Sequence, residues 1–305
     1  IYRALVLLVI SCPCALVLSI PLSYFAGIGK AAKHGILVKG SNYIDVLCEV
    51  RVVAFDKTGT LTKGVLRVSD IVTYNGFNRE EVLEYAAMAE AYSNHPLAKA
   101  IVEARGKTPM SVDMEYEEIP GHGIRARYRG VEVIVGNDRI LHRFNVEHGT
   151  CNVPGTVVHV VVNRRYAGYI LVSDEVKGDA VEAIKWLKKL GIWRIVMVTG
   201  DSRGVAKKIA RELGFDTYYA ELLPSDKIRV VEELVKQGFG KVAFVGDGIN
   251  DAPVLARADV GIAMGGLGSD AAIENSDVVI MDDRLVKIPL AIEISRKTRR
   301  IVWEN

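Results

Sequence analysis

The sequence of 305 residues contains little cysteine, few aromatic residues and no excess of charge of either sign. Its 39 Lys and Arg nearly balance 37 Asp and Glu, and a formal charge of +2 gives no electrostatic argument for a nucleic-acid partner. Of its four cysteines, Cys12 and Cys14 lie one residue apart in an apolar run, which does not suit a disulfide framework. We therefore expect a reducing, cytoplasmic environment for most of the chain.

A long uncharged segment lies near the start of the sequence. Residues 4–29 are 26 positions without a charged side chain. As a helix they would rise roughly 39 Å, enough to cross a hydrocarbon core of about 30 Å. Arg3 precedes the segment and Lys30, Lys33 and Lys39 follow it, so the positive-inside rule places its C-terminal end in the cytoplasm. We predict a membrane helix here rather than a buried helix of a soluble core.

Cys12, Pro13 and Cys14 lie inside this predicted membrane helix. Proline lacks a backbone donor and clashes with the preceding turn, so the helix should kink or unwind and let both sulfurs face one spot. Thiolates suit soft ions such as copper(I), zinc, cadmium or lead. The pair therefore predicts a site for a transported heavy metal. The alternative is that two small apolar side chains merely flank a kink.

The heptapeptide 56–62 (DKTGTLT) follows a short, apolar, β-branched run at residues 51–55, which is typical of a buried strand. The carboxylate of Asp56 would emerge where that strand ends, beside the loop that contains Gly59. A carboxylate held there among backbone N–H groups can attack a phosphoryl group and form an aspartyl phosphate. The alternative is an acidic residue that only forms a turn.

Two kinds of pattern follow along the chain. Helices at 78–92 and from Pro96, then short alternating strands, predict an α+β domain inserted after the first strand. From Asp174 on, strands alternate with helices, which predicts an α/β fold with a doubly wound parallel sheet and ligands beyond its strand C-termini. The predicted segments are a membrane helix and cytoplasmic linker (1–45), the sheet domain (46–64 and 167–286), the inserted domain (65–166) and the start of a next core helix (287–305).

Three predicted strands of the sheet end in polar residues. They are followed by Asp56, by Thr199-Gly200-Asp201 and by the segment 246–251 (GDGIND), so these groups should converge at one sheet edge. Asp56 and Asp247 can hold magnesium, which prefers hard oxygen ligands. Thr199 can donate a hydrogen bond to a phosphoryl oxygen, and Lys227 can supply a fixed positive charge.

The order of these motifs resembles the haloacid-dehalogenase-like phosphorylation domain of P-type ATPases, and the Cys-Pro-Cys pair narrows the resemblance to the heavy-metal-transporting subfamily. The resemblance implies ATP and Mg²⁺ as cofactors and phosphorylation of Asp56. It also implies that Asp56, the backbone carbonyl of Thr58 and Asp247 bind the magnesium. The catalytic residues carried over by this resemblance are Asp56, Lys57, Thr58, Thr199, Gly200, Asp201, Lys227, Asn250 and Asp251.

The inserted domain is also similar to that of this family. A Glu five residues before a His-Pro pair, a Gly-x-Gly and a Gly-Asn recur in the family in this order. The resemblance implies that they form the adenosine pocket, which here would consist of Glu90, His95, Gly121, Gly123, Gly136 and Asn137.

The departures from the family point to an incomplete catalytic core. The sequence contains no Thr-Gly-Glu, the family's actuator motif. We expect a fragment of an integral membrane protein whose catalytic domains are cytoplasmic, with the actuator domain and the remaining membrane helices elsewhere in the same polypeptide. A soluble phosphatase is the main alternative, but such enzymes commonly carry an Asp as general acid–base where this chain has Thr58. A non-catalytic membrane metal-binding protein would not need the set Asp56, Thr199, Lys227 and Asp247.

The residues after the Cys-Pro-Cys pair favour zinc, cadmium or lead as the transported ion. Copper-type members of the family typically continue with Ala-Leu-Gly-Leu-Ala-Thr-Pro. This sequence has Val17 and Ser19 in place of the Gly and Ala. Because soft thiolates alone do not separate the two groups of ions, transport of copper(I) stays open as an alternative.

Overall fold

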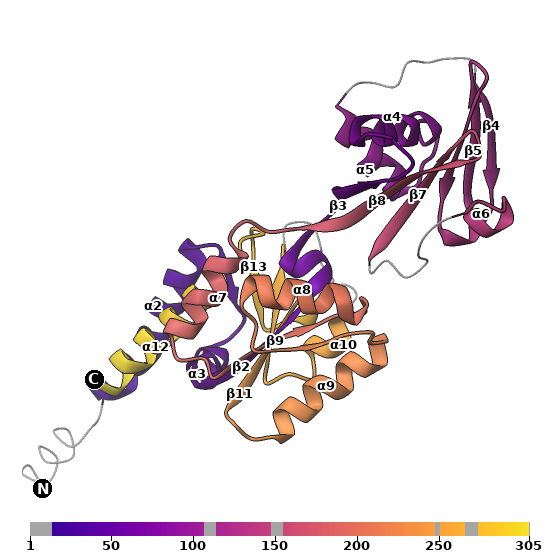
Figure 1. The fold of residues 1–305 in the computed structure, drawn as a ribbon. Helices are drawn as coiled ribbons and strands as arrows, with labels where there is room; N and C mark the ends of the chain where they lie inside the picture. Colours follow the sequence, from indigo (N-terminus) through magenta and orange to yellow (C-terminus); the bar gives the residue numbers. More distant parts are fainter. Residues whose placement is uncertain (1–13, 107–113, 148–154, 248–250, 266–273, 305) are drawn as a thin grey trace, which may run out of the picture. The chain divides into compact units, whose positions relative to one another are not determined.

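The computed structural model describes residues 14–106, 114–147, 155–247, 251–265 and 274–304, with side chains from residue 17 onward. Within these ranges the chain divides into two compact units (Figure 1). The first unit comprises the residues up to Leu61 and those from Val176 on, and the second is Thr62–Glu175. Cys12, the side chain of Cys14 and Asn250, which the sequence assigns to sites, lie outside the described residues.

The first unit is built on a seven-stranded sheet in the order β1-β13-β12-β11-β2-β9-β10. Neighbouring strands are parallel, except that β1 runs antiparallel to β13. The predicted α/β doubly wound sheet is therefore confirmed. The strands are β1 (Ile36–Val38), β2 (Val50–Asp56), β9 (Arg194–Val198), β10 (Thr217–Tyr219), β11 (Lys241–Gly246), β12 (Val260–Met264) and β13 (Val278–Ile280).

Strand β2 shows why this sheet is covered on both faces. Val53 and Phe55 belong to one buried core, whereas Val52 and Ala54 belong to a second. Such a strand has no polar face and is stable only in the middle of a sheet with helices on both sides. Side chains of α3 (Ser41–Glu49), α7 (Ala180–Lys189), α8 (Arg203–Leu213) and α12 (Lys287–Glu304) complete the first core, and those of α9 (Pro224–Lys236) and α10 (Ala252–Leu255) complete the second.

Helix α2 (Cys14–Lys33) covers the second part of the predicted membrane segment and packs beside α12 (Figure 1). Across the part of the chain that the structure describes, no helix is both long and apolar enough to cross a membrane. The predicted membrane helix begins at residue 4, so its first part lies outside the described residues. The predicted linker after residue 30 is not a plain connector, because it contains β1 and α3, and both pack into the first core.

The second unit is a six-stranded sheet in the order β3-β8-β7-β6-β5-β4. The pairs from β8 to β4 are antiparallel. Helices α4 (Arg79–Ala89) and α5 (Pro96–Arg105) pack on one core of the sheet, and α6 (Asp138–Arg143) packs on another. Its strands are β3 (Thr62–Thr73), β4 (Glu115–Ile119), β5 (Gly123–Tyr128), β6 (Val131–Gly136), β7 (Thr156–Val162) and β8 (Arg165–Val176).

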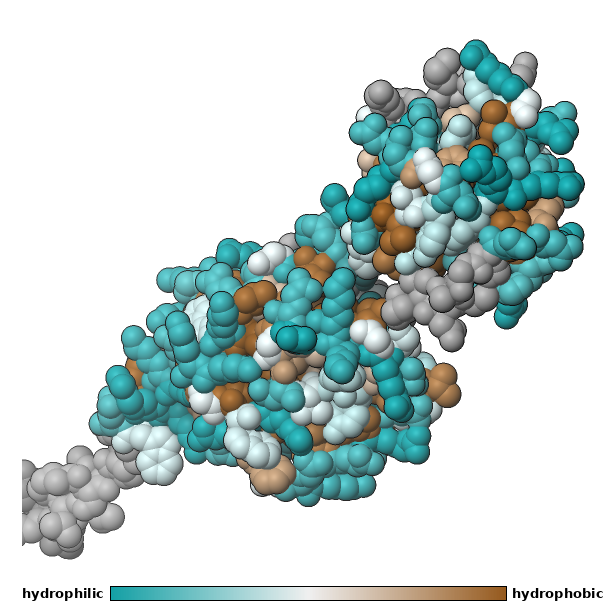
Figure 2. All heavy atoms as spheres, in the orientation of Figure 1, coloured by the Kyte–Doolittle hydropathy of each residue, from teal (hydrophilic) through white to brown (hydrophobic). Residues whose placement is uncertain are grey.

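The sequence signals at the starts of α4 and α5 act as predicted. The Asn78 side chain accepts a hydrogen bond from the Glu81 N–H while the Glu81 side chain accepts one from the Asn78 N–H, which is a capping box. Pro96 occupies the first turn of α5, where its missing N–H costs nothing. On the face shown in Figure 2, hydrophobic residues occur in small groups among hydrophilic ones, as expected when the large apolar side chains fill buried cores.

Candidate active site

The candidate active site lies at the C-terminal edge of the first unit's sheet. Strand β2 runs between β11 and β9, with Phe55 opposite Val245 and Asp56 opposite Val198. The residues after these three strand ends are therefore neighbours, although they are far apart in the sequence. Asp56 and Thr199 are both buried. The structure thus brings together three of the segments that the sequence assigns to chemistry.

Lys227 connects two of the carboxylates at this edge. It lies in the first turn of α9, and its Nζ is 2.6 Å from Asp56 Oδ1 and 3.0 Å from Asp251 Oδ1. The pKa of Asp56 is raised to about 6, because burial and the nearby carboxylates of Asp251 and Asp247 raise it more than Lys227 lowers it. Burial also raises the pKa of Asp251, against the lowering effect of Lys227. Lys227 therefore favours the ionised form of Asp56, which is the nucleophilic one.

A second ion pair fixes the turn that follows Asp56. Lys57 Nζ lies 2.5 Å from Asp201 Oδ2, and both residues flank the strand ends of β2 and β9. The hydroxyl oxygen of Thr199 accepts a hydrogen bond from the Asp201 N–H at 3.1 Å. That contact uses an acceptor lone pair of Thr199 and leaves its O–H able to donate to a phosphoryl oxygen.

Two glycines let these groups come close together. Gly59 has a φ of +74°, and a Cβ added there would lie 3.7 Å from Asp247 Oδ2, so the turn after Asp56 passes directly over Asp247. A Cβ on Gly246 would lie 2.8 Å from Asp251 Oδ2. A side chain at Gly246 would therefore displace the carboxylate that pairs with Lys227.

The donor set fits a magnesium ion. Asp56 and Asp247 are close enough for Asp247 to raise the pKa of Asp56, so a cation between them would offset this repulsion. Among the described residues, no cluster of three or more His, Cys, Asp or Glu could hold a metal ion by itself. Magnesium needs no such cluster, since it is usually held by one or two carboxylates together with substrate phosphates and water.

The residues assigned to the adenosine pocket lie in the second unit, and Glu90 is the most unusual of them. It ends α4 with only 7% of its surface exposed. Its pKa is raised to about 7, because burial and the Glu118 carboxylate raise it more than a hydrogen bond with Ser93 lowers it. A carboxyl group kept near its titration point by burial is common at binding and catalytic sites.

His95 has a structural role as well. It is the N-cap of α5, and its Nδ1 accepts a hydrogen bond from the Leu97 N–H at 3.2 Å. The residue is exposed. With Nδ1 as an acceptor, the neutral ring carries its proton on Nε2, which is then the nitrogen that can donate to a ligand.

The glycines of the predicted pocket differ from one another. A Cβ on Gly123 would lie 2.1 Å from the Val135 oxygen, and one on Gly136 would lie 2.1 Å from the His122 oxygen. These two glycines are therefore required by the close approach of β5 and β6. Gly121, with a φ of +73°, meets nothing within 4 Å. The Asn137 side chain donates to the Gly121 oxygen at 2.9 Å and so fixes the Gly121 turn.

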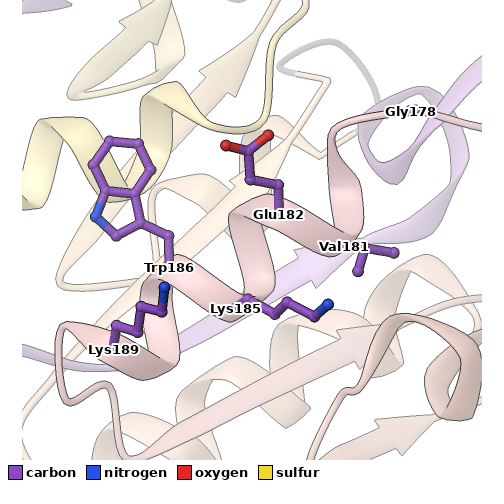
Figure 3. A pocket seen from close by; sticks show the side chains of 6 residues that line it. All are labelled: Gly178, Val181, Glu182, Lys185, Trp186 and Lys189. Atoms are coloured by element: carbon purple, nitrogen blue, oxygen red, sulfur yellow. The ribbon is translucent and has the colours of Figure 1, made fainter.

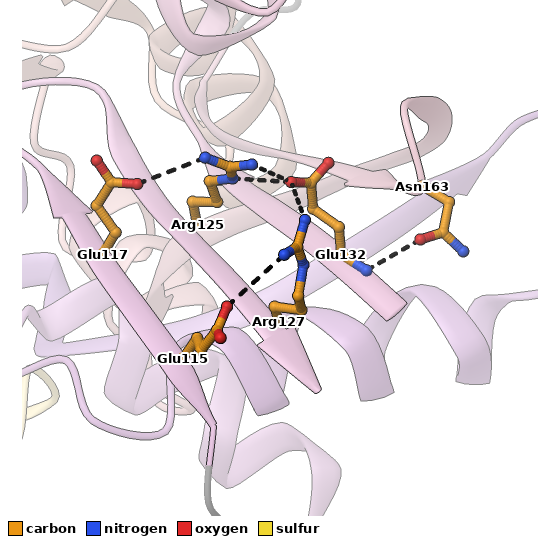
Figure 4. Close-up of polar contacts among 6 residues, drawn as sticks. All are labelled: Glu115, Glu117, Arg125, Arg127, Glu132 and Asn163. Carbon is orange, nitrogen blue, oxygen red and sulfur yellow. Dashed lines mark hydrogen bonds and ion pairs between the residues drawn. The ribbon is translucent and has the colours of Figure 1, made fainter. Parts of the chain in front are cut away.

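A charged network supports the strands on both sides of this turn (Figure 4). Arg125 on β5 lies 2.5 Å from Glu132 on β6 and 3.7 Å from Glu117 on β4. Arg127 lies 3.8 Å from both Glu132 and Glu115. Single exposed ion pairs stabilise little, but a network across three strands holds their register. The Gly121 turn joins two of these strands.

Tyr116 and Glu118, which belong to no recognisable sequence motif, also surround Glu90. The Tyr116 ring lies 6.2 Å from that of the exposed Tyr92, edge to face. Burial is the main cause that raises the pKa of the Tyr116 hydroxyl, and the carboxylates of Glu118 and Glu90 raise it further. Only the pairing of β4 with β5 brings these groups toward α4, and no short motif marks them.

A separate pocket in the first unit has no comparable chemistry. It measures about 550 Å³ and lies on the outer face of α7 (Figure 3). Its charged side chains, Glu182, Lys185 and Lys189, extend in different directions, and the carboxylate of Glu182 is its single acidic group. The carboxylate edge around Asp56 is therefore the better candidate for the active site.

The titration of Glu90 leads to a first prediction. Its folded pKa lies above the ordinary value, so the folded chain binds the extra proton and this group lowers stability as pH rises from about 4.5 to about 7. We expect Glu90→Gln to stabilise the second unit by about 2–3 kcal/mol at pH 8 and by little near pH 5. Chemical denaturation of the whole chain at both pH values measures this, with Glu103→Gln, at an exposed carboxylate of α5, as the control. A stabilisation that is equal at both pH values would contradict it.

Comparison with known proteins agrees with this geometry. The family model of haloacid dehalogenase-like hydrolases matches residues 50–259. The chain belongs to the haloacid dehalogenase-like hydrolase family. The match includes β2 with Asp56, the whole second unit, and β9 and β11 with the residues that follow them.

Individual relatives confirm the resemblance to metal-transporting ATPases. The chain is 59% identical to a zinc-transporting ATPase of Synechocystis sp. over 100% of the chain and 43% of the relative. It is 53% identical to a cadmium, zinc and cobalt-transporting ATPase of Bacillus subtilis over 100% of the chain and 44% of the relative. The crystal structure of a zinc-transporting PIB-type ATPase in the E2.Pi state matches with a TM-score of 0.86 and 37% identity over 100% of this chain and 50% of that one. This chain thus spans less than half the length of those two curated relatives.

Proposed function

We propose that this chain is the catalytic core of a P-type ATPase that uses ATP to transport a soft divalent metal ion across a membrane. The observation that carries the proposal is the buried Asp56 carboxylate, held 2.6 Å from Lys227 at a sheet edge it shares with Asp247. Support comes from relatives that are named as zinc-, cadmium- and cobalt-transporting ATPases.

The proposed reaction is a phosphoryl transfer to Asp56. A carboxylate oxygen of Asp56 attacks the terminal phosphorus of ATP, the bond to the bridging oxygen breaks, and ADP leaves with that electron pair. Lys227 keeps Asp56 ionised, and the Thr199 hydroxyl donates to a phosphoryl oxygen. Bound Mg²⁺, held by Asp56, Asp247 and the carbonyl of Thr58, would neutralise phosphate charge. Lys57 and Asp201 hold the turn in place through their ion pair.

Thr58 distinguishes this proposal from a soluble phosphatase. A threonine two residues after the nucleophile has no acidic group to activate water, so the aspartyl phosphate should persist until another segment supplies one. We propose that this segment is an actuator domain in the same polypeptide. Asn250 and the transported-metal ligands Cys12 and Cys14 are part of the proposal, although they lie outside the described residues.

In the proposed division of labour the second unit binds the nucleotide. Glu90, His95, Gly121 and Asn137 would surround the adenosine, and Gly123 and Gly136 would hold the strands that carry the Gly121 turn. The proposed location is a membrane, with both units on its cytoplasmic side.

A second prediction separates nucleotide binding from phosphoryl transfer. We expect His95→Ala to weaken ATP binding about tenfold, equivalent to one lost hydrogen bond or stacking contact. Phosphorylation of Asp56 by acetyl phosphate, which needs only the sheet edge, should be unchanged. Because His95 also caps α5, His95→Asn is the matched control, since it retains the cap. If His95→Asn bound ATP like the unmodified chain, His95 would only cap the helix.

A third prediction concerns the transported ion. A transporter that contains this sequence together with its actuator and remaining membrane helices should hydrolyse ATP faster when zinc, cadmium or lead is added in the presence of thiols. Cys12→Ser and Cys14→Ser should remove that stimulation, because an alcohol is a much weaker ligand for soft ions. Stimulation by copper(I) or silver alone would favour the copper alternative.

A further inference from the structure

An exposed aromatic pair lies at the sheet edge opposite the candidate active site. Trp193 and Phe239 are 55% and 53% exposed, and their ring centroids are 4.3 Å apart. Trp193 directly precedes β9 and Phe239 lies two residues before β11. Both strands run from this edge toward Thr199 and Asp247, so the pair lies at the N-terminal ends of the parallel strands. Large aromatic side chains placed together on a surface often mark an interaction site.

Two arginines lie beside the aromatic pair. The Arg194 guanidinium lies 5.7 Å from the Trp193 ring, and Arg51 donates to the Gly191 oxygen while its own carbonyl accepts from the Trp193 N–H. Among the residues that the structure describes, neither guanidinium forms an ion pair with a carboxylate; Arg194 contacts the amide oxygen of Gln237 instead. The surface therefore presents aromatic rings together with two guanidinium groups that form no ion pair with a described carboxylate.

The helix pair α2 and α12 projects past this same edge. Atoms of Lys287 lie near Gly35, and atoms of Thr298 lie near Gly27, so the two helices run antiparallel. Arg296 of α12 donates to the oxygen of Leu190, immediately before the loop that carries Trp193. The residues of α12 after 298, and those of α2 before 27, therefore extend beyond the edge with the aromatic pair.

The projecting part of the helix pair exposes several large apolar side chains, beside the charged residues Arg299, Arg300 and Glu304 of α12. Its large exposed hydrophobic side chains are Val17, Leu18, Leu22, Phe25, Ile301 and Trp303. This stretch of α2 belongs to the uncharged run 4–29 that the sequence assigns to a membrane helix. A bilayer that receives these side chains would have its headgroup region at the level of the sheet edge.

We infer that the edge formed by Trp193, Phe239, Arg51 and Arg194 docks on the anionic headgroup region of a lipid bilayer. The aromatic rings sit at the boundary between headgroups and acyl chains, where Trp and other amphipathic rings are favoured, and the guanidiniums bind lipid phosphates. This inference rests on the proposed membrane location of the chain. The docked edge would be a second contact with the bilayer, in addition to that of the helix pair α2 and α12. It would fix the height of the phosphorylation site above the membrane.

Depth-dependent fluorescence quenching tests the inference on the 305-residue chain. The protein is inserted into phosphatidylcholine vesicles with or without phosphatidylglycerol, and a part of the lipid is brominated near the headgroup end of its acyl chains. The variant Trp186→Phe/Trp303→Phe leaves Trp193 as the single tryptophan. Its emission should fall at least roughly twofold more than that of a matched variant in which only Trp186, on the outer face of α7, is retained.

A third single-tryptophan variant, which retains Trp303, separates the possible failures. If Trp303 were quenched in its variant but Trp193 were not quenched in its own, the docking edge would be refuted and the proposed membrane location would stand. Quenching of neither residue would overturn both. Equal quenching of Trp186 and Trp193 would also overturn the inference, since the chain would then adsorb without a preferred face.

The arginines give an independent readout. We expect Arg51→Gln and Arg194→Gln each to reduce the preference of Trp193 for anionic over neutral vesicles by about fivefold. Lys207→Gln, at an exposed lysine within α8, is the control for general loss of positive charge. If the two arginine variants and the control behaved alike, specific recognition of headgroup phosphates at this edge would be refuted.

Discussion

Asp56→Asn is expected to abolish phosphorylation of the chain by ATP and Mg²⁺. The unmodified chain should acquire a phosphate that is stable in acid and released by hydroxylamine, because a carboxyl phosphate is a mixed anhydride. An amide oxygen is a poor nucleophile, and Asn is close enough in shape to Asp to fill the same buried position. The variant should therefore fold and still show no label.

Radiolabelling followed by acid precipitation and peptide mapping measures this outcome. Asp216→Asn is the matched control, since this carboxylate accepts a hydrogen bond from the Ile195 N–H at the opposite edge of the same sheet. An Asn oxygen can still accept that bond, so the control should be labelled normally. Undiminished labelling of Asp56→Asn would place the chemistry at another residue.

The catalytic edge could be predicted from the sequence because its geometry follows from the strand order. Asp56, Thr199 and Asp247 each follow an apolar run that can only be a buried strand, and parallel strands place their C-terminal ends together. The position of Lys227 was predictable as well, because Pro224 sets the start of its helix. The contact between Lys227 and Asp251 was not, since it depends on the missing side chain of Gly246.

The second unit was harder to predict in detail. Strand β3 (Thr62–Thr73) carries mostly half-exposed and exposed residues, and its burial alternates only over residues 65–70, so its strand signal in the sequence is weak. The family resemblance implies that Gly123 and Gly136 belong to the adenosine pocket, and the structure adds that each faces a backbone carbonyl of the neighbouring strand. Local motifs identify such residues but do not tell which neighbour requires them.

The short strand β1 and the helix α3 were not predicted from the sequence, for a different reason. Strand β1 is three residues long and pairs with β13, which lies some 240 positions later in the sequence. A strand this short has almost no local signal, and its pairing is decided by tertiary contacts alone. The sequence therefore predicted only a linker here, without these two elements.

Lys227→Ala is expected to lower the rate of Asp56 phosphorylation by about 10²–10³-fold, the usual effect of removing a preorganised charge from such a site. Two effects act together. The variant loses the positive charge that faces the transferred phosphoryl group, and it leaves Asp56 and Asp251 as neighbouring buried carboxylates without their shared partner. Lys236→Ala, an exposed lysine at the other end of α9, is the matched control and should have no effect.

The pH dependence of the remaining activity distinguishes this role from a general loss of structure. With Lys227 present, the pKa of Asp56 is about 6, and Lys227 is the group that lowers it. Its removal should raise that pKa, so the residual phosphorylation rate should increase over a more alkaline pH range than in the unmodified chain. The double variant Lys227→Ala/Asp251→Asn removes one of the two carboxylates and should recover part of the lost stability and shift the profile back toward lower pH. Its rate at the plateau should stay low, because the phosphoryl group still lacks its positive partner. If Lys227→Ala alone had the same pH profile as the unmodified chain, Lys227 would not control the ionisation of Asp56.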